Sequence, residues 1–221
     1  MKRLGVNIDH IATLRNARGE KHPNPVFAAK EVIKFGANSV TIHLREDRRH
    51  INDLDTKEIC ALNKVLVNLE VSMNSEIVKK ALRYKPNYIC IVPENRKEII
   101  FKFKKSNIRT SLFINPNLND IKLSKKLNVD CVEIHTGKLA NHVKSRKNFL
   151  SELNRIKKSS KLASKLDIEV HAGHGLDYKT TKILTKIKEI EEFNIGHFII
   201  GESIFYGLPK VIKDFKKIIK N

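Results

Sequence analysis

The sequence predicts an α/β fold, a (β/α)8 TIM barrel with additional short helices, from three observations. Apolar strands and helical segments alternate about eight times along the 221 residues, with the short connections that parallel βαβ units use. Eight such units in a chain of this length favour a (β/α)8 barrel. The structural rival is an open doubly wound sheet, but neither a GxGxxG motif nor a P-loop follows the first strand. We therefore expect one barrel domain that spans residues 1–221.

The expected strands are short apolar runs, most of which end at polar residues, glycine or proline. They cover residues 5–9, 39–44, 65–71, 88–92, 109–114, 129–135, 167–172 and 193–196. The segment 198–205 is either a continuation of the last strand or a short extra helix, because a short apolar run does not distinguish the two.

The expected helices follow these strands and carry start and stop signals. They cover residues 26–35, 55–63, 75–84, 97–105, 119–127, 139–166, 178–190 and 211–220. Asp55 and Ser75 are the expected N-caps of the second and third helices, and Pro86 breaks the third. Between the first strand and the first helix we expect a polar loop that ends in Pro23 and Pro25.

The composition excludes several classes of protein. No apolar run approaches the roughly 18 residues of a membrane span, and the N-terminus leads into a strand instead of a signal sequence, so we expect a cytoplasmic protein without a membrane partner. The cysteines are odd in number and widely spaced, which favours neither disulfides nor zinc. The net charge of +19 raises nucleic acid as a partner. The lysines are spread over many helices without interleaved aromatic residues, so we expect no specific nucleic-acid binding.

Polar side chains gather at the carboxyl ends of the expected strands. The stretch VTIHLREDRRH, residues 40–50, begins as an apolar strand and then places seven ionisable residues within positions 43–50. Polar residues two apart, which share one face of a strand, recur on other strands. The pairs at the carboxyl ends are Asn7 and Asp9, His43 and Arg45, Asn68 and Glu70, and Glu133 and His135, and a further pair, Glu169 and His171, lies further back on the seventh strand. One pair alone is more simply a structural hydrogen bond, but the recurrence predicts a common polar site at the barrel mouth.

Two glycine-rich turns follow the last two expected strands. They are Ala172-Gly173-His174-Gly175 and Asn194-Ile195-Gly196-His197, with Gly201 beyond them. Each turn alone is weak evidence, because glycine commonly closes strands. Barrels often bind phosphate after strands seven and eight, where backbone N–H groups and a short helix point at the anion. The placement of the two turns therefore predicts a phosphate pocket.

Several motifs together resemble one known family. They are GVNIDHIATLRNARG (5–19), VTIHLREDRRHI (40–51), NLE (68–70), VPE (92–94), EIHTG (133–137), AGHGL (172–176) and NIGHFIIG (194–201). In this order they resemble the pyridoxine 5′-phosphate synthase family. The resemblance implies a (β/α)8 barrel with extra helices, assembled as a homo-octamer. It also implies the condensation of 1-deoxy-D-xylulose 5-phosphate with 3-amino-2-oxopropyl phosphate to pyridoxine 5′-phosphate, phosphate and water, with neither metal nor organic cofactor.

The resemblance also assigns roles to individual residues. It implies that His43 and Glu70 are proton acceptors, that His174 is the proton donor, and that Glu133 stabilises a transition state. The residues implied to bind the aminoketone phosphate are Asn7, Arg18, Gly175, Gly196 and His197. Those implied to bind the deoxyxylulose phosphate are Asp9, His10, Arg45 and His50. Histidine suits proton shuttling and arginine suits phosphate oxygens, so the residue types fit the chemistry.

Two positions depart from the family pattern. The family has a Thr-Thr-Glu-Gly-Gly lid loop after Val-Pro-Glu, but this chain has KEIIFKFKKS, residues 97–106, with Ile100 near the expected threonine. A shortened lid predicts slower turnover, leakier intermediates, or replacement by a loop of a neighbouring subunit. His171 stands where asparagine is expected.

Two rival functions remain open from the sequence. A metal-dependent barrel hydrolase would use Asp9, His135, His171 and His174, whose side chains would have to converge on one ion. A degenerate barrel that only binds a phosphorylated ligand or nucleic acid is favoured by the shortened lid alone. The complete set of acidic and basic residues argues against that second rival.

Overall fold

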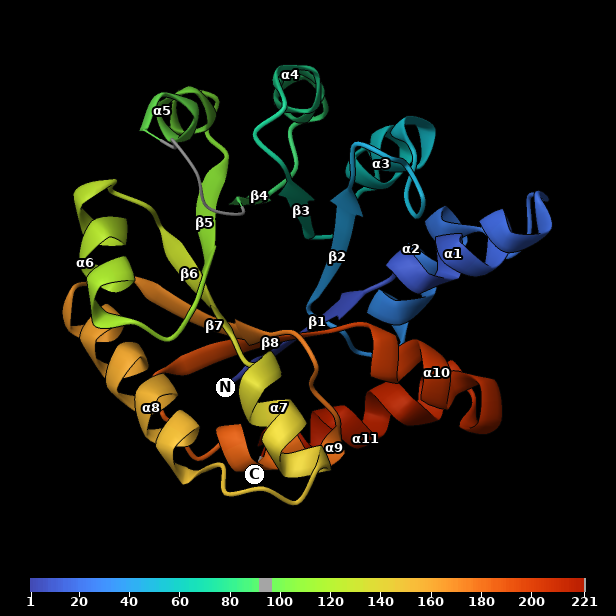
Figure 1. Ribbon diagram of the computed structural model, residues 1–221. Helices are drawn as coiled ribbons and strands as arrows, with labels where there is room; N and C mark the ends of the chain where they lie inside the picture. The colour runs from blue at the N-terminus through green and yellow to red at the C-terminus, as the bar shows by residue number, and fades with distance from the viewer. Residues whose placement is uncertain (92–96, 221) are drawn as a thin grey trace.

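The computed structural model describes residues 1–91 and 97–220, whose strands close into one parallel barrel (Figure 1). The strands are β1 (Arg3–Asn7), β2 (Ser39–Leu44), β3 (Val67–Val71), β4 (Tyr88–Ile91), β5 (Arg109–Ile114), β6 (Cys131–His135), β7 (Glu169–Gly173) and β8 (Ile190–Ile195). Each strand pairs in parallel with its sequence neighbour, and β8 pairs with β1 to close the ring. The predicted (β/α)8 barrel is confirmed.

The helices surround this barrel (Figure 1). They are α1 (Asp9–Arg18), α2 (Pro25–Lys34), α3 (Asp53–Cys60), α4 (Ser75–Tyr84), α5 (Lys97–Lys105), α6 (Leu118–Lys126), α7 (Gly137–Lys144), α8 (Leu150–Lys165), α9 (Tyr178–Leu184), α10 (His197–Tyr206) and α11 (Leu208–Lys220). The strand residues that face the helices, such as Val40, Ile42 and Leu44 of β2, are completely buried. The core is thus an apolar layer between the strands and the helices, and no described helix is long and apolar enough to cross a membrane.

Helix α1 lies where the sequence predicted a polar loop, so that prediction was wrong. The first strand ends at Asn7 and not at Asp9 as predicted, and α1 begins at Asp9. The inward face of α1 includes Arg15, which donates to the two carboxylate oxygens of Asp55 in α3 at 2.6 and 2.8 Å. Because this face combines the ion pair with the small side chain of Ala12 in the core, the helix lacks the strong hydrophobic periodicity that the prediction required.

Other boundaries differ from the predicted ones. The segment 139–166 forms two helices, α7 and α8, and the segment 178–190 forms α9 and the start of β8. The open question at 198–205 is answered by a helix, α10. The N-caps of α3 and α4 are Asn52 and Asn74, not Asp55 and Ser75. Asp55 instead completes a capping box, in which its carboxylate accepts the Asn52 N–H at 3.0 Å. The predicted end of the fourth strand, at Val92, lies outside the described residues.

The interior of the barrel is polar, and its amino-terminal end is closed by an ion network. Arg3 of β1 donates to Glu192 of β8 at 2.7 Å and contacts Glu169 of β7. Arg109 of β5 donates to the other oxygen of Glu169 at 2.7 Å. His171, also of β7, lies 2.8 Å from Glu169 through its Nε2 atom. The predicted pair Glu169 and His171 therefore belongs to this floor, where opposite charges compensate each other's burial.

Candidate active site

A cavity of about 670 Å³ opens at the carboxyl ends of the strands, a size typical of small-ligand sites. The predicted site residues that line it are Asn7, Asp9, His10, His43, Arg45, Glu70, Glu133, His174, Gly175, Gly196 and His197. They come from both ends of the chain and from the strands between them. The structure thus brings most of the predicted site into one place.

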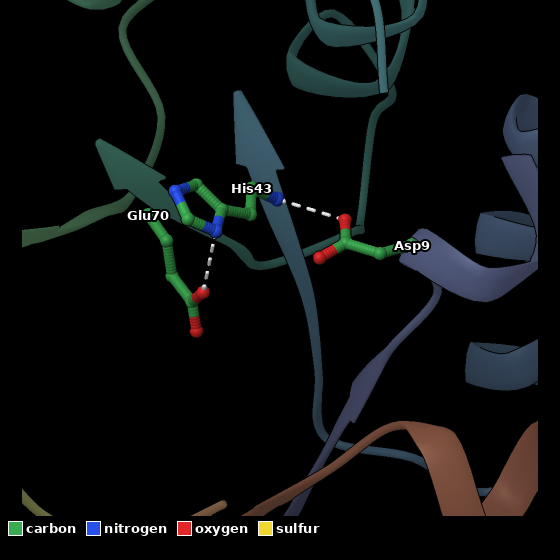
Figure 2. A group of neighbouring side chains, drawn as sticks. All are labelled: Asp9, His43 and Glu70. Carbon is green, nitrogen blue, oxygen red and sulfur yellow. Dashed lines mark hydrogen bonds and ion pairs between the residues drawn. The ribbon is translucent and has the colours of Figure 1, made fainter. Parts of the chain in front are cut away.

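Asp9, His43 and Glu70 form a compact group, as Figure 2 shows, and all three line the cavity. His43 and Glu70 are register partners on β2 and β3, so their side chains lie next to each other. The His43 Nδ1 atom is 3.6 Å from Glu70 Oε2, which is within ion-pair reach but too long for a hydrogen bond. Asp9 starts α1 and accepts the backbone N–H of His43 at 2.9 Å. A carboxyl, an imidazole and a second carboxyl therefore lie within reach of one substrate.

The surroundings of this group lower the pKa of the His43 imidazole and raise the pKa values of the Asp9 and Glu70 carboxyl groups. Burial, and after it the positive charge of Arg45, lowers the pKa of His43 to about 4. Burial raises the pKa of Asp9 to about 6, although hydrogen bonds from His43 and Asn7 oppose the rise. Burial, and then the charges of Glu133 and Asp9, raises the pKa of Glu70 well above its ordinary value. The Glu70 side chain keeps 24% of its surface open to the cavity, so water there moderates that rise.

Glu133 of β6 lies on the opposite side of the barrel interior and is held from two directions. The Asn194 side-chain amide, from β8, donates to Glu133 Oε2 at 2.7 Å. A Cβ atom at Gly173 would lie 1.9 Å from Glu133 Oε1, so only glycine fits beside this carboxylate. Glu133 is 3% exposed, and its burial raises its pKa while the charge of His171 and the Asn194 amide lower it. Glu70 and Glu133 thus oppose each other's ionisation in a single cavity.

His174 lies in the turn after β7 with a left-handed backbone, at a φ of 77°. The hydroxyl of Thr136 lies 2.8 Å from the His174 carbonyl oxygen, and the His174 ring stacks on His135 with a centroid separation of 4.5 Å. Gly175 continues the turn with a φ of 78°. A Cβ atom added to Gly175 would lie 3.1 Å from the Ala140 Cβ atom, so there is little room for a side chain. Backbone geometry and a ring contact thereby fix the direction of the His174 side chain.

Two imidazoles, those of His10 and His197, and Arg45 line the side of the cavity between α1 and α10, and a third imidazole, that of His50, packs against His10. The ring of His10 lies 4.9 Å from that of His197 and 5.8 Å from that of His50, measured between centroids. His197 is the first residue of α10, so it lies at the positive end of that helix. Arg45 holds Asp47 with two contacts, at 3.0 and 3.2 Å, and presents its guanidinium at the cavity wall. This side of the cavity suits an anion.

Two predicted binding residues do not line the cavity. Arg18 lies at the end of α1 with 80% of its side chain exposed, and its contact is Glu20 at 3.9 Å. His50 lies behind His10 and shares a 2.6 Å hydrogen bond between its Nδ1 atom and the Thr13 hydroxyl. Within this structure Arg18 is a surface residue, and His50 reaches the site only through its neighbours.

Several lining residues were not predicted as functional. Asn194 was noted only as part of a glycine-rich turn, although it is buried and bonded to Glu133. Its signal was a polar residue two positions before Gly196 at the end of an apolar strand. Lys144, the last residue of α7, and Phe113 of β5 also line the cavity. Neither of these carries a signal in a single sequence, because lysine and phenylalanine are common on helices and strands.

The segment at the position of the family's lid loop forms helix α5, and its buried residues face the core. Ile100, near the expected threonine, is 2% exposed in α5, packs into the main hydrophobic cluster and does not line the cavity. The motif Val92 to Glu94 lies outside the described residues. Along α5, therefore, no side chain takes the place of a lid residue over the cavity.

The ligand set of the predicted metal hydrolase does not converge in the described part of the chain. Of Asp9, His135, His171 and His174, the residue His171 is bound to Glu169 at the barrel floor, whereas Asp9 lies in the group with His43 and Glu70. In that group the Asp9 oxygens already accept N–H groups of His43 and Asn7, at 2.9 and 3.0 Å. The group is therefore arranged for hydrogen bonding and proton transfer.

The sequence matches one family model along nearly its whole length. The model described as pyridoxal phosphate biosynthesis protein PdxJ matches residues 4–101 and 97–221. The two matches meet at residues 97–101, at the start of α5.

Curated relatives resemble the chain from end to end. A pyridoxine 5′-phosphate synthase of Pelagibacter ubique is 61% identical over 236 positions, covering 99% of each chain. A protein of the same name from Zymomonas mobilis is 44% identical and covers 98% of this chain and 91% of its own. Because the first alignment has 236 positions and this chain has 221 residues, the Pelagibacter protein has residues without a counterpart here.

Solved structures of lower identity share the fold. A phosphoribosylanthranilate isomerase of Pyrococcus furiosus superposes with a TM-score of 0.67 at 17% identity and covers 100% of both chains. One from Thermotoga maritima gives a TM-score of 0.69 at 14% identity, covering 100% of this chain and 99% of its own. At these identities the likeness shows the barrel fold alone. The family match and the curated relatives show more: the chain belongs to the PdxJ family of pyridoxal phosphate biosynthesis proteins.

Proposed function

We propose that this protein is a pyridoxine 5′-phosphate synthase. It condenses 1-deoxy-D-xylulose 5-phosphate with 3-amino-2-oxopropyl phosphate to pyridoxine 5′-phosphate, phosphate and water. The observation that carries the proposal is the meeting of His43, Glu70, Glu133 and His174 in one cavity that has an anion-binding side. Imine formation, loss of phosphate and ring closure need acids, bases and anion cradles, and these are the groups that the cavity contains.

His43 and Glu70 act as the proton acceptors of this reaction. A His43 pKa of about 4 leaves the imidazole neutral and able to accept a proton at neutral pH. Glu70 is a stronger base than an ordinary carboxylate once ionised, because burial and its acidic neighbours raise its pKa. The His43 Nδ1 and Glu70 Oε2 atoms are 3.6 Å apart, so both groups can contact one substrate. A proton that one of them accepts from the substrate can then pass to the other.

Glu133 and His174 act on the opposite side of the substrate. Glu133 is held by Asn194 and by the lack of a side chain at Gly173, so its oxygen atoms have fixed positions against a cationic intermediate such as a protonated imine. His174 projects from a fixed turn after β7 and donates a proton to a leaving oxygen. Asn194 thereby joins the site as a residue that orients Glu133.

The two phosphates occupy the rim of the cavity. Arg45 and His10 bind the sugar phosphate, and Asp9 accepts a hydrogen bond from a hydroxyl group of the sugar. His50 stays a predicted ligand of this phosphate, although it lies outside the cavity lining. The buried His10 Nδ1 atom, which has no hydrogen-bond partner among the described residues, supports a polar ligand there. Gly175, Gly196 and His197 bind the aminoketone phosphate, since the lack of a side chain at Gly196 lets its backbone pack closely against Asn7 and α10 begins at His197. Arg18 stays a predicted ligand of that phosphate, although its side chain lies at the surface.

The shortened connection after β4 limits turnover and does not remove the reaction. The division of the family matches at residues 97–101 supports a deletion there, and the Pelagibacter relative has residues without a counterpart in this chain. The acid and base residues named above remain in the cavity despite the shortening. A site without a full lid admits more water, so we predict slow turnover with some loss of intermediates. A cytoplasmic location and an octameric assembly also remain predictions.

Product analysis tests the proposed function. The purified protein is mixed with both substrates, and pyridoxine 5′-phosphate is quantified by chromatography, with EDTA present in a parallel reaction. The proposal predicts product at equal rates in both reactions. Product that disappears with EDTA and returns with zinc or manganese would instead favour metal chemistry at Asp9, His43 and Glu70. Substrate binding without product would identify a binding-only barrel.

A further inference from the structure

A second histidine lies directly behind the proposed proton donor. The rings of His135 and His174 are nearly parallel, with an interplanar angle of 26° and centroids 4.5 Å apart. His135 ends β6, and its register partner on β7 is Gly173, the residue before His174. His174 lines the cavity, but His135 is not among the lining residues. His135 therefore contacts the proposed proton donor without lining the cavity itself.

The residue after His135 fixes the backbone that carries His174. The Thr136 N–H donates to the Gly173 carbonyl at 2.9 Å. Its hydroxyl lies 2.7 Å from the same carbonyl oxygen and 2.8 Å from that of His174, and donates to either of them. A φ of 77° is unfavourable for a residue with a Cβ atom, so the turn needs such support.

The next residue, Gly137, provides the space for the two rings. A Cβ atom at this position would lie 2.7 Å from His135 Cε1 and 2.7 Å from His174 Cδ2. On the other side, the ring of Phe113 packs edge-on against His135 at 5.2 Å and lies 6.4 Å from His174. The three consecutive residues His135, Thr136 and Gly137 thus form one support, which we call the His174 cradle.

We propose that His135 is a positioning residue that holds the His174 imidazole in its proton-donating orientation by ring stacking. The proposal rests on the synthase function for its catalytic meaning, but its geometry stands independently of the reaction. Burial, and then the charge of His174, lowers the pKa of His135, while Glu152 of α8 raises it. A neutral aromatic face is thereby available behind His174 when His174 carries the proton that it donates.

Two substitutions separate stacking from the chemistry of the imidazole. His135→Phe keeps an aromatic face of similar thickness, whereas His135→Ala removes it. We expect His135→Ala to lower kcat about 10- to 100-fold, with the KM of each substrate within about 3-fold of wild type, because losses of supporting residues have this size. His135→Phe should keep kcat within about 3-fold of wild type. The control His142→Ala removes a histidine of α7 whose ring contacts the Asn148 carbonyl outside the cavity, and its kcat should be unchanged.

A spectroscopic readout tests the stacking without any turnover. In NMR spectra of protein labelled with ¹³C in its histidine rings, the chemical shift of the His174 ring should change in His135→Ala. In His135→Phe it should stay near its wild-type value. Unchanged His174 resonances and kcat in His135→Ala would overturn the proposal, as would equal loss of kcat in the two variants. If the wild-type protein makes no product, the synthase function fails, and the resonance shift alone decides whether His135 positions His174. Melting temperatures of both variants within a few degrees of wild type establish that they fold.

Discussion

Replacing Asp9 by asparagine removes a buried negative charge while keeping the shape of the side chain. Asp9 is 6% exposed, and its carboxylate accepts the His43 N–H at 2.9 Å and the Asn7 side-chain N–H at 3.0 Å. An asparagine can turn its oxygen toward the His43 N–H, but its NH2 group then faces the Asn7 donor. Asn7 cannot rotate in response, because its own oxygen accepts the N–H of residue 9 at 2.9 Å. The variant therefore lacks the buried negative charge of Asp9 and has one hydrogen bond fewer.

The size and sign of the effect follow from the pKa of Asp9. Burial raises this pKa from 3.8 to about 6. A shift of about two pKa units corresponds to about 3 kcal/mol of destabilisation once the group is ionised in both states. Because the folded-state pKa is raised, this penalty is absent below pH 4, grows between pH 4 and 6, and is complete above pH 6. The lost hydrogen bond costs about 1 kcal/mol at every pH.

Thermal unfolding at a series of pH values measures the balance between the removed charge penalty and the lost hydrogen bond. We expect Asp9→Asn to be more stable than wild type by about 2 kcal/mol at pH 8, or about 4–8 °C in melting temperature, and slightly less stable at pH 4. The control Asp214→Asn removes an acid whose pKa is lowered by Lys210, so it should not gain stability at any pH. A melting-temperature difference between Asp9→Asn and wild type that stays constant from pH 4 to 8 would refute the buried charge. Synthase activity of Asp9→Asn should fall, because Asp9 contributes to the site and not to the stability of the fold.

Three further substitutions test other parts of the structure. Glu70→Gln should lower kcat about 10²- to 10⁴-fold, as expected when a general base is lost, and unchanged product formation would remove Glu70 from that role. Gly173→Ala should displace Glu133, because the new Cβ atom would lie 1.9 Å from its Oε1 atom; we expect a loss of product formation of at least about 10-fold, and wild-type kinetics would contradict the packing. Arg15→Ala leaves the carboxylate of Asp55 buried without its partner, so the free energy of unfolding should fall by about 3 kcal/mol in denaturant titrations, and a change below about 0.5 kcal/mol would show that the pair is not important for the fold.

The barrel, and the gathering of most candidate site residues in one cavity, were predictable because their signals are local. Apolar runs with β-branched residues mark the strands, and the polar residues two apart at the ends of β2, β3 and β6 mark the mouth of the barrel. The carboxyl ends of parallel strands meet in any closed barrel, so residues as distant in sequence as Asp9 and Glu133 could be placed in one site without a structure.

Other features were not predictable because they depend on contacts between distant segments. The inward face of helix α1 includes the ion pair of Arg15 and Asp55, which no hydrophobic periodicity reveals. Asn194 became a site residue only once its amide was found on Glu133. The pair Glu169 and His171 was placed further back on its strand, as the structure has it, but its ion network with Arg3 and Arg109 on the barrel floor joins three strands and has no signal in the sequence.

The central claim is that this barrel carries out the ring-forming condensation. A single-turnover ³¹P NMR experiment with enzyme in excess over both phosphorylated substrates tests it most directly. We predict that the two substrate signals are replaced by equal amounts of inorganic phosphate and pyridoxine 5′-phosphate. Signals of both substrates that broaden or shift on binding, without any release of inorganic phosphate, would contradict the claim and identify a barrel that only binds its ligands.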